Sequence, residues 1–135
     1  MIKIGIIGAY RGSDFPKAAK DFTGAKVTAI CVRDEKRNEW LKQRDPENYT
    51  YFSDLDEMLN SDIDAVILCN YFCEHAPFAI KALKAGKHVL SETLSNITMA
   101  EGVALKRAAE ESGKIYMIGE NYPYMCALME MKKEY

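Results

Sequence analysis

Short apolar runs alternate with helical patterns along almost the whole chain, and this alternation limits the possible folds more than any other feature. The runs are rich in Ile, Val and Leu, and they cover Ile4–Ile7, Val27–Val32, Ala65–Cys69, His88–Leu90 and Ile115–Ile118, with a very short addition at Tyr51–Phe52. Because they are continuously apolar, they indicate strands buried on both faces of a parallel sheet. The sequence therefore predicts one α/β domain, a doubly wound parallel sheet of the Rossmann type with right-handed βαβ crossovers.

Capping residues mark the helices between the runs. Asp34 is placed to cap a helix that continues through Trp40, and Ser53 a short helix through Leu59. Pro77 falls in the first turn of a helix that Gly86 ends. These signals support the alternation of strands and helices.

A capping box opens the next predicted helix. Thr98 and Glu101 have the required spacing, and Gly113 ends the helix. Its inner face is predicted from small apolar residues, which are Ala100, Val103, Ala104 and Ala108. A last helical pattern covers Ala127–Tyr135 without a Gly or Asn stop signal.

Charge and cysteine usage favour small-molecule chemistry in the cytoplasm. The net charge of −2 over 135 residues offers no positive field for nucleic acid or an anionic membrane, and no apolar stretch is long enough for a spanning helix. All four cysteines have apolar neighbours, which is typical of reduced thiols. Cys69, Cys73 and His75 match no common zinc spacing, so we expect no metal site.

The first strand leads into a glycine-containing turn, the usual phosphate-binding place in a doubly wound sheet. The candidate cofactor-binding residues are Gly8, Ala9, Tyr10, Arg11 and Gly12. Glycines allow a pyrophosphate to approach the backbone, and the following helix supplies amide donors. Tyr10 takes the place of the second glycine of G-x-G-x-x-G, and the spacing to Gly12 is one residue short.

The end of the second strand bears on the choice between NAD and NADP. An acidic residue about 20 positions after the first turn usually binds the adenosine ribose. Val32 stands there and cannot accept a hydrogen bond, while Asp34 competes with its capping role. Arg33 suits a 2′-phosphate, and it equally suits a solvated surface position. The sequence leaves NAD and NADP both open.

Later segments carry a resemblance to a known family. They are Asp64–Cys69, His75–Pro77, Ala79–Glu92, Gly113–Lys114 and Gly119–Tyr122. In these segments the chain resembles the N-terminal nucleotide-binding half of the glucose-fructose oxidoreductase and inositol 2-dehydrogenase family, Gfo/Idh/MocA, and the similarity extends over essentially all 135 residues.

The resemblance implies further cofactor-binding residues. Asn70, Tyr71 and His75 belong to a loop that follows the fourth strand and lies along the nicotinamide half of the cofactor. Glu92 matches the glutamate of the family's Glu-Lys-Pro motif, and Asn121 the asparagine after the sixth strand. The alternative for His75, Glu92 and Asn121 is a structural role in a helix start, a backbone contact and a turn.

One position departs from the family at the point where catalysis is expected. Thr93 replaces the lysine that contacts the nicotinamide ribose and the substrate in family members, and Leu94 replaces the proline. Thr supplies no ammonium group, so the catalytic residue is left unknown. Loss of a general acid or base typically slows a reaction by about 10²- to 10⁴-fold.

The resemblance therefore predicts the nucleotide-binding domain of an NAD(P)-dependent oxidoreductase acting on a sugar, a polyol or a related small hydroxy compound. A non-catalytic or regulatory dinucleotide-binding module is the alternative, because Tyr10, Val32 and Thr93 depart from the pattern. A third interpretation is chemistry with tightly bound NAD and no net oxidation.

The chain is expected to be inactive alone, because family members contact substrate mainly through a second, C-terminal α/β domain. We predict an NAD(P)-binding domain over residues 1–120, and a linker with the start of a helix over residues 121–135. Apolar side chains in this last segment predict packing against the second domain or another copy of the chain, which would make a homo-oligomer.

Overall fold

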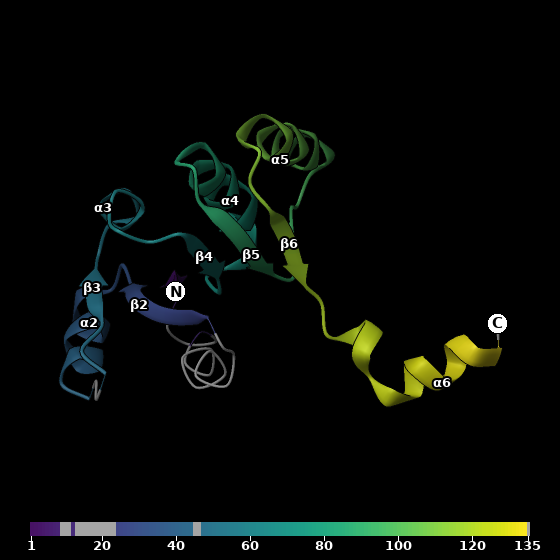
Figure 1. The fold of residues 1–135 in the computed structure, drawn as a ribbon, viewed down its shortest axis with the longest axis horizontal. Coiled ribbons are helices and arrows are strands. Elements are labelled where there is room, and N and C mark those ends of the chain that lie inside the picture. Colours follow the sequence, from purple (N-terminus) through teal and green to yellow (C-terminus); the bar gives the residue numbers. More distant parts are fainter. Residues whose placement is uncertain (9–11, 13–23, 45–46, 135) are drawn as a thin grey trace.

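Six parallel strands form a single sheet in the computed structural model, which describes residues 1–8, 12, 24–44 and 47–134 (Figure 1). The strands are β1 (Ile2–Ile7), β2 (Ala25–Cys31), β3 (Thr50–Phe52), β4 (Ala65–Leu68), β5 (His88–Glu92) and β6 (Tyr116–Gly119). Their order across the sheet is β3-β2-β1-β4-β5-β6, with parallel pairing throughout. This order confirms the predicted doubly wound sheet.

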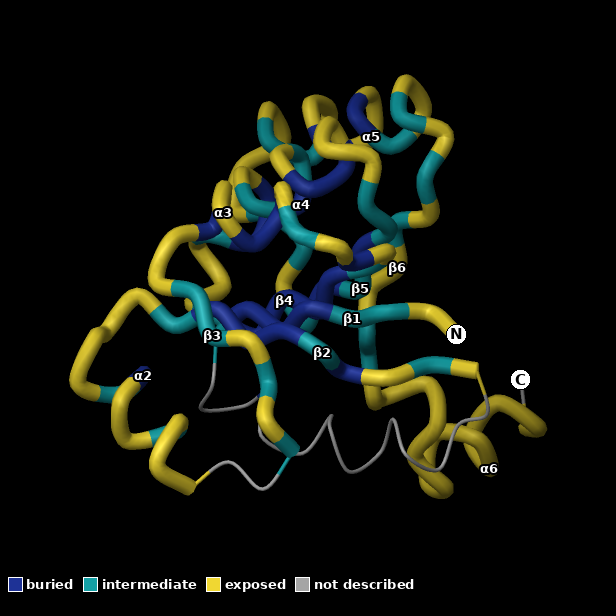
Figure 2. Tube along the Cα trace, turned by 60° about the vertical axis from the view of Figure 1, so that its left-hand side comes forward, coloured by how far each residue is buried: buried dark blue, intermediate teal, exposed yellow. Residues whose placement is uncertain are grey.

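Helices connect the strands. They are α2 (Glu35–Lys42), α3 (Leu55–Leu59), α4 (His75–Lys84), α5 (Met99–Ser112) and α6 (Cys126–Glu134), with short 3₁₀ turns η2 (Phe72–Glu74) and η3 (Tyr122–Tyr124). Figures 1 and 2 show α3, α4 and α5 on one side of the sheet. The helix predicted between β1 and β2 lies outside the described residues.

The core is divided between the two faces of the sheet. The larger cluster joins buried strand residues such as Val66 and Leu68 to Met58 of α3, Leu83 of α4 and Leu105 of α5. A smaller cluster on the opposite face is built from Ile6, Val27, Ile67 and Cys69. Strands with apolar residues on both faces explain the continuous apolar runs of the sequence.

For the first helices, two start signals agree with the sequence and one differs. Asp34 caps α2 through the amide of Arg37, and Pro77 lies in the first turn of α4. Asp54, not the predicted Ser53, caps α3, because its carboxylate accepts from the amides of both Asp56 and Glu57 at 2.8 and 3.1 Å. A carboxylate that satisfies two free amides is favoured at a helix N-terminus.

Helix α5 begins and ends where predicted, with a capping box and a left-handed Gly113, but its inner face is rotated. Ala100, Val103 and Ala104 are exposed, and the buried residues are Leu105 and Ala108. Alanine fits either side of a helix, so the one bulky leucine decides which face packs on α4 and the sheet.

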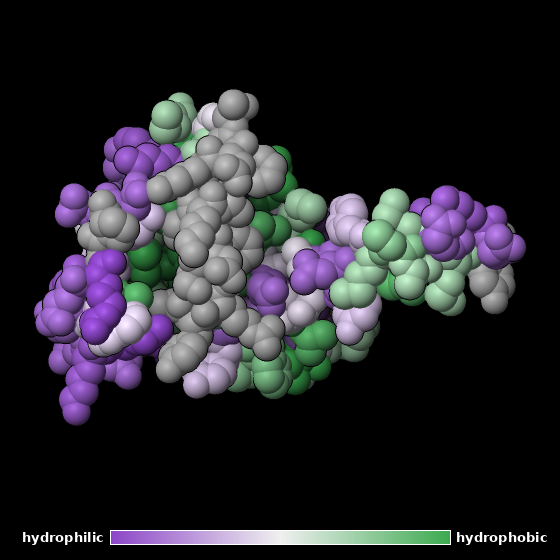
Figure 3. Space-filling view, turned by 90° about the horizontal axis from the view of Figure 1, so that it is seen from below, coloured by the Kyte–Doolittle hydropathy of each residue, from purple (hydrophilic) through white to green (hydrophobic). Residues whose placement is uncertain are grey.

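The end of the chain projects from the rest of the domain. We call η3 and α6, from Tyr122 to Glu134, the projecting end; Figures 1 and 2 show it extending away from the sheet. Its exposed apolar residues are Tyr122, Tyr124, Met125, Leu128, Met129 and Met131. In Figure 3 it carries a hydrophobic surface ahead of a hydrophilic tip. Among the described residues, no helix is both long and apolar enough to span a membrane.

Candidate functional site

The direction of strand order reverses between β1 and β4, so the loops after these two strands diverge at the carboxyl edge of the sheet. Ligands of doubly wound sheets bind at this switch point. Gly8 lies there, with its amide donating to the Cys31 carbonyl at 3.1 Å. Its φ is +91°, and a Cβ on it would lie 2.6 Å from the backbone of Cys69. Only glycine fits this position.

The rest of the first turn is described only at Gly12. A Cβ at Gly12 would lie 2.5 Å from Cγ2 of Ile6, so Gly12 packs tightly on the first strand. Ala9, Tyr10 and Arg11, which the sequence selects as cofactor-binding residues, lie outside the described residues.

At the end of β2, Arg33 is already paired. Its Nη2 lies 2.5 and 2.7 Å from the two carboxylate oxygens of Glu74, in η2 after β4. The guanidinium carbon also lies 5.6 Å from the centre of the Phe78 ring. Asp34 is committed to its cap, and the amide of Val32 donates to Phe52 at 2.9 Å. The pair therefore joins the loops after β2 and β4.

Asn70, the second residue after β4, presents an acceptor at the switch point. Its Nδ2 donates to the Glu74 carboxylate at 3.2 Å. Its Oδ1 is buried and has no hydrogen-bond partner within the described part of the chain. A buried acceptor is costly to leave unpaired, so it fits a ligand that brings a hydroxyl or amide donor, as a dinucleotide does. The neighbouring Tyr71 is 75% exposed.

His75 is buried, with only 1% of its surface exposed, and both ring nitrogens face carbonyl oxygens. Nδ1 lies 2.7 Å from the carbonyl of Leu94, after β5, and Nε2 lies 3.2 Å from the carbonyl of Asn70, after β4. The side chain thus holds together the two loops that the resemblance assigns to the nicotinamide half. In this structure it supports the loops and does not face an open surface.

Glu92 and Thr93 stand side by side at the end of β5. Glu92 is the last residue of the strand, in register with Gly119 of β6, and Thr93 is half-buried. Asn121 is exposed beyond β6, and its carbonyl accepts from the amide of Tyr124 at 3.0 Å. These residues lie at the same carboxyl edge as Asn70.

The lysines nearest to Thr93 in sequence lie elsewhere. Lys87 precedes β5 and donates to the carbonyl of Ile63 at 2.7 Å, at the opposite edge. Lys114 precedes β6 and lines a hollow between α5 and β6. Neither supplies the ammonium group that Thr93 lacks.

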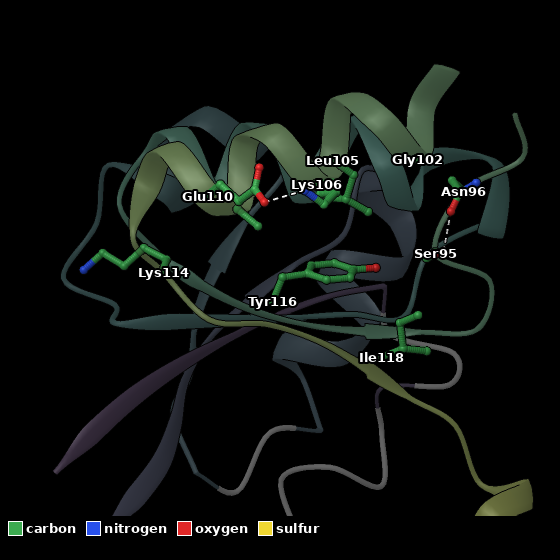
Figure 4. A pocket seen from close by; sticks show the side chains of 10 residues that line it. Ser95, Asn96, Gly102, Leu105, Lys106, Glu110, Lys114, Tyr116 and Ile118 are labelled. Carbon is green, nitrogen blue, oxygen red and sulfur yellow. Dashed lines mark hydrogen bonds and ion pairs between the residues drawn. The ribbon is translucent and has the colours of Figure 1, made fainter. Parts of the chain in front are cut away.

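That hollow has a volume of about 510 Å³ (Figure 4). Tyr116 and Ile118 of β6 form its floor, and the ion pair of Lys106 and Glu110 lies above it on α5. Burial raises the pKa of the Tyr116 phenol. The hollow lies along the free edge of the sheet, away from the switch point, so we assign the site to the carboxyl edge.

The cysteines are free thiols. Cys31 and Cys69 are buried, while Cys73 and Cys126 are exposed. Burial raises the pKa of the Cys31 thiol to about 11, which keeps it protonated at neutral pH. Within residues 1–8, 12, 24–44 and 47–134, no three His, Cys, Asp or Glu side chains form a group that could hold a metal ion.

Sequence reasoning missed two participants in this site. Glu74 joins Arg33 to Asn70, and the Leu94 carbonyl receives His75. The sequence indicates Glu74 only indirectly, because this residue follows Asn70 by four positions in the same loop. Nothing in the sequence indicates the Leu94 carbonyl, since a backbone acceptor is independent of the side chain. We call Arg33, Glu74, Asn70, His75 and the Leu94 carbonyl the edge network.

A known family and several curated proteins are similar to this chain in sequence. A family described as "Oxidoreductase family, NAD-binding Rossmann fold" and designated GFO_IDH_MocA matches residues 2–120. Among curated relatives, "Glycosyl hydrolase family 109 protein 1" of Shewanella sp. strain ANA-3 is 33% identical over an alignment of 134 residues, which covers 92% of this chain and 29% of that protein. "Alpha-N-acetylgalactosaminidase" of Shewanella oneidensis is 32% identical, with the same coverage.

Solved structures share the fold. The WlbA dehydrogenase of Bordetella pertussis, in complex with NADH and UDP-GlcNAcA, superposes with a TM-score of 0.88 at 24% identity, over 98% of this chain and 41% of that one. Apo scyllo-inositol dehydrogenase of Lactobacillus casei gives 0.85 at 25%, over 98% and 40%. The chain thus spans less than half the length of these proteins. The comparisons lend no support to a non-catalytic module.

Proposed function

The chain belongs to the Gfo/Idh/MocA oxidoreductase family with its NAD-binding Rossmann fold, and we propose that it is the cofactor-binding part of an enzyme that oxidises a sugar, a polyol or a related small hydroxy compound. The observation that carries the proposal is the switch-point edge, where a buried Asn70 acceptor adjoins loops held by His75. When bound, the nicotinamide supplies the hydride chemistry.

The residues of the carboxyl edge have different proposed roles in binding. Gly8 allows close backbone approach at the first turn, and the Asn70 amide oxygen accepts from the ligand. His75 fixes the two loops that flank the nicotinamide half, as a positioning residue. Glu92 ends β5, and Thr93 and Asn121 follow β5 and β6, where substrate meets the cofactor in the proposed arrangement.

Thr93 sets a limit on catalysis by this chain. Its hydroxyl can donate a hydrogen bond, but it cannot deliver a proton as an ammonium group does. We propose that residues 1–120 are the NAD(P)-binding domain and that residues 121–135 are a linker and the start of a helix. In this proposal proton transfer comes from a second domain joined to that helix. The exposed apolar residues of the projecting end support such packing.

The projecting end also allows a dimer of this chain through the same apolar residues. Light scattering separates the alternatives: a dimer that Met129→Ser dissociates supports self-association, and a strict monomer supports a second domain. The free thiols of all four cysteines agree with a reducing compartment such as the cytoplasm.

Calorimetric titration with NADH tests the binding function. We expect saturable binding with a dissociation constant below about 1 mM, and unchanged heats across that range would exclude a cofactor-binding role. For catalysis, the complete gene product is incubated with NAD and a panel of sugars and polyols, and NADH is followed by absorbance. Thr93→Lys in that protein is expected to raise turnover if Thr93 limits proton transfer.

A second candidate function is glycoside cleavage with NAD and no net oxidation, favoured by the names of the relatives from Shewanella. In this scheme bound NAD would supply reversible hydride transfer at the sugar, water would replace the leaving group, and NAD would be unchanged at the end. A chromogenic α-N-acetylgalactosaminide distinguishes the two: dye release without NADH accumulation supports cleavage, and NADH accumulation supports oxidation.

A further inference from the structure

Arg33 and Glu74 occupy the part of the carboxyl edge that reads the adenosine ribose in doubly wound domains. Arg33 is the second residue after β2, and that strand end is where such domains distinguish a 2′-hydroxyl from a 2′-phosphate. Val32, beside it, offers no side-chain acceptor. Any selection between NAD and NADP at this strand end therefore falls to Arg33 and its partner.

Several neighbouring groups contact the ion pair of Arg33 and Glu74. Both carboxylate oxygens of Glu74 lie within 2.7 Å of Nη2 of Arg33, and the Phe78 ring lies 5.6 Å from the guanidinium carbon. The Asn70 amide donates to the same carboxylate. The Glu74 side chain is 24% exposed and that of Arg33 is 59% exposed. Glu74 is thus the fixed member, and it determines where the guanidinium lies.

We propose that Glu74 makes this domain selective for NAD over NADP by neutralising Arg33 and by presenting a carboxylate at the place of the missing acidic residue. A 2′-phosphate brings up to two negative charges toward that carboxylate, and recruiting Arg33 would leave Glu74 half-buried without its cation. A 2′-hydroxyl is neutral and can donate to the carboxylate. This inference rests on the proposed cofactor-binding function.

Cofactor titrations of single and double variants test it. The chain and its Glu74→Gln variant are titrated with NADH and NADPH at one ionic strength. Glutamine keeps the shape and the acceptor oxygen but releases Arg33 from its ion pair. We expect NADPH to bind about tenfold more tightly to the variant, and NADH affinity to change by less than about threefold.

The double variant Arg33→Ala/Glu74→Gln separates the electrostatic role from a structural one. The gain in NADPH affinity is expected to disappear in it, because the cation that would bind the phosphate is gone. Glu110→Gln is the matched control, since it also removes a carboxylate from an exposed ion pair, with Lys106 on α5. It should leave both affinities unchanged.

The inference is contradicted if the ratio of NADPH affinity to NADH affinity in Glu74→Gln lies within about twofold of that of the unmodified chain. It is also contradicted if the gain in NADPH affinity persists in the double variant without Arg33, or if Glu110→Gln shows the same gain. These outcomes leave the proposed function standing if the unmodified chain binds NADH. Failure of the unmodified chain to bind NADH removes both.

Discussion

Two regions at the carboxyl side of the domain differ in how their side chains are held. In the edge network, Arg33, Glu74, Asn70 and His75 contact one another or backbone carbonyls across the loops after β2, β4 and β5. In the projecting end, the described side chains from Tyr122 to Glu134 are exposed, and those that are large are mostly apolar.

The difference separates what this chain shapes by itself from what needs additional contacts. Polar groups that hold one another lower the entropic cost of ordering loops before a ligand binds. An exposed apolar helix gains little stability from its own chain and has to be covered by something else. We therefore propose cofactor binding for the first region and further assembly for the second.

The largest effect is expected at the base of the edge network. Gly8→Ala puts a Cβ 2.6 Å from backbone atoms at a φ of +91°. We expect it to lower the free energy of unfolding by at least about 3 kcal/mol and to abolish NADH binding. Gly24→Ala is the matched control, because Gly24 also has a positive φ, +102°, but no atom of the described residues lies within 4 Å of an added Cβ. Gly24→Ala should lower the free energy of unfolding by about 1 to 2 kcal/mol.

Urea unfolding followed by circular dichroism measures both glycine variants. Equal losses of stability in the two would mean that φ alone matters, and that the close approach between the loops after β1 and β4 does not.

The two histidines of the chain test the network itself. His75→Ala removes a buried side chain and its ring-nitrogen contacts with the carbonyls of Leu94 and Asn70, so we expect the free energy of unfolding to fall by about 3 kcal/mol. His88→Ala removes one half-buried acceptor of the Ile115 amide, and it should cost about 1 kcal/mol. Denaturant unfolding compares them; a smaller loss for His75 than for His88 would contradict the assigned role.

The start of α5 lies at the same edge, and its residue Glu101 makes the stability of the domain depend on pH. The amides of Ile97 and Thr98 donate to Glu101 and lower the pKa of its carboxyl group. Its contribution to stability is thus present above the unfolded pKa of about 4.3 and is lost as the pH falls through the lowered folded value. Glu101→Gln should remove this acid-sensitive part.

Melting temperatures measured from about pH 6 down to about pH 3 check this prediction. Thr98→Ala is the comparison, because it should cost about 1 kcal/mol while the backbone amides still hold Glu101. A Glu101→Gln variant whose melting temperature falls with acid as steeply as that of the unmodified chain would rule out the assignment.

The smallest effect is expected in the projecting end. Met129 is 51% exposed on α6, so Met129→Ala should change the free energy of unfolding by less than about 0.5 kcal/mol. Met58 of α3 is fully buried, and Met58→Ala should cost about 3 kcal/mol. Chemical denaturation of both variants tests the contrast. A large loss at Met129 would show that the projecting end is packed in solution.

The fold followed from the sequence because its signals are local. Continuous apolar runs identify the strands. Asp34 and Thr98 mark helix starts through hydrogen bonds from amides three positions later, and Gly113 ends α5 in the left-handed conformation. The buried face of α5 could not be predicted from the sequence, because Ala100 and Ala104 are small enough for either face of the helix.

The candidate site was predictable only in part. The resemblance drew attention to Asn70 and His75, and the structure brings both to the switch point. That Arg33 pairs with Glu74, 41 positions later, depends on how two loops meet, and no local pattern encodes such a contact. The role of His75 depends likewise on a distant carbonyl.

Hydrogen–deuterium exchange of this chain with and without NADH tests the central claim most directly. If the carboxyl edge binds the cofactor, NADH should slow amide exchange in residues 70–75 and 92–95 and leave residues 122–134 unchanged. Slower exchange confined to residues 122–134, or no change in either loop at saturating NADH, would contradict the assignment of cofactor binding to the edge network.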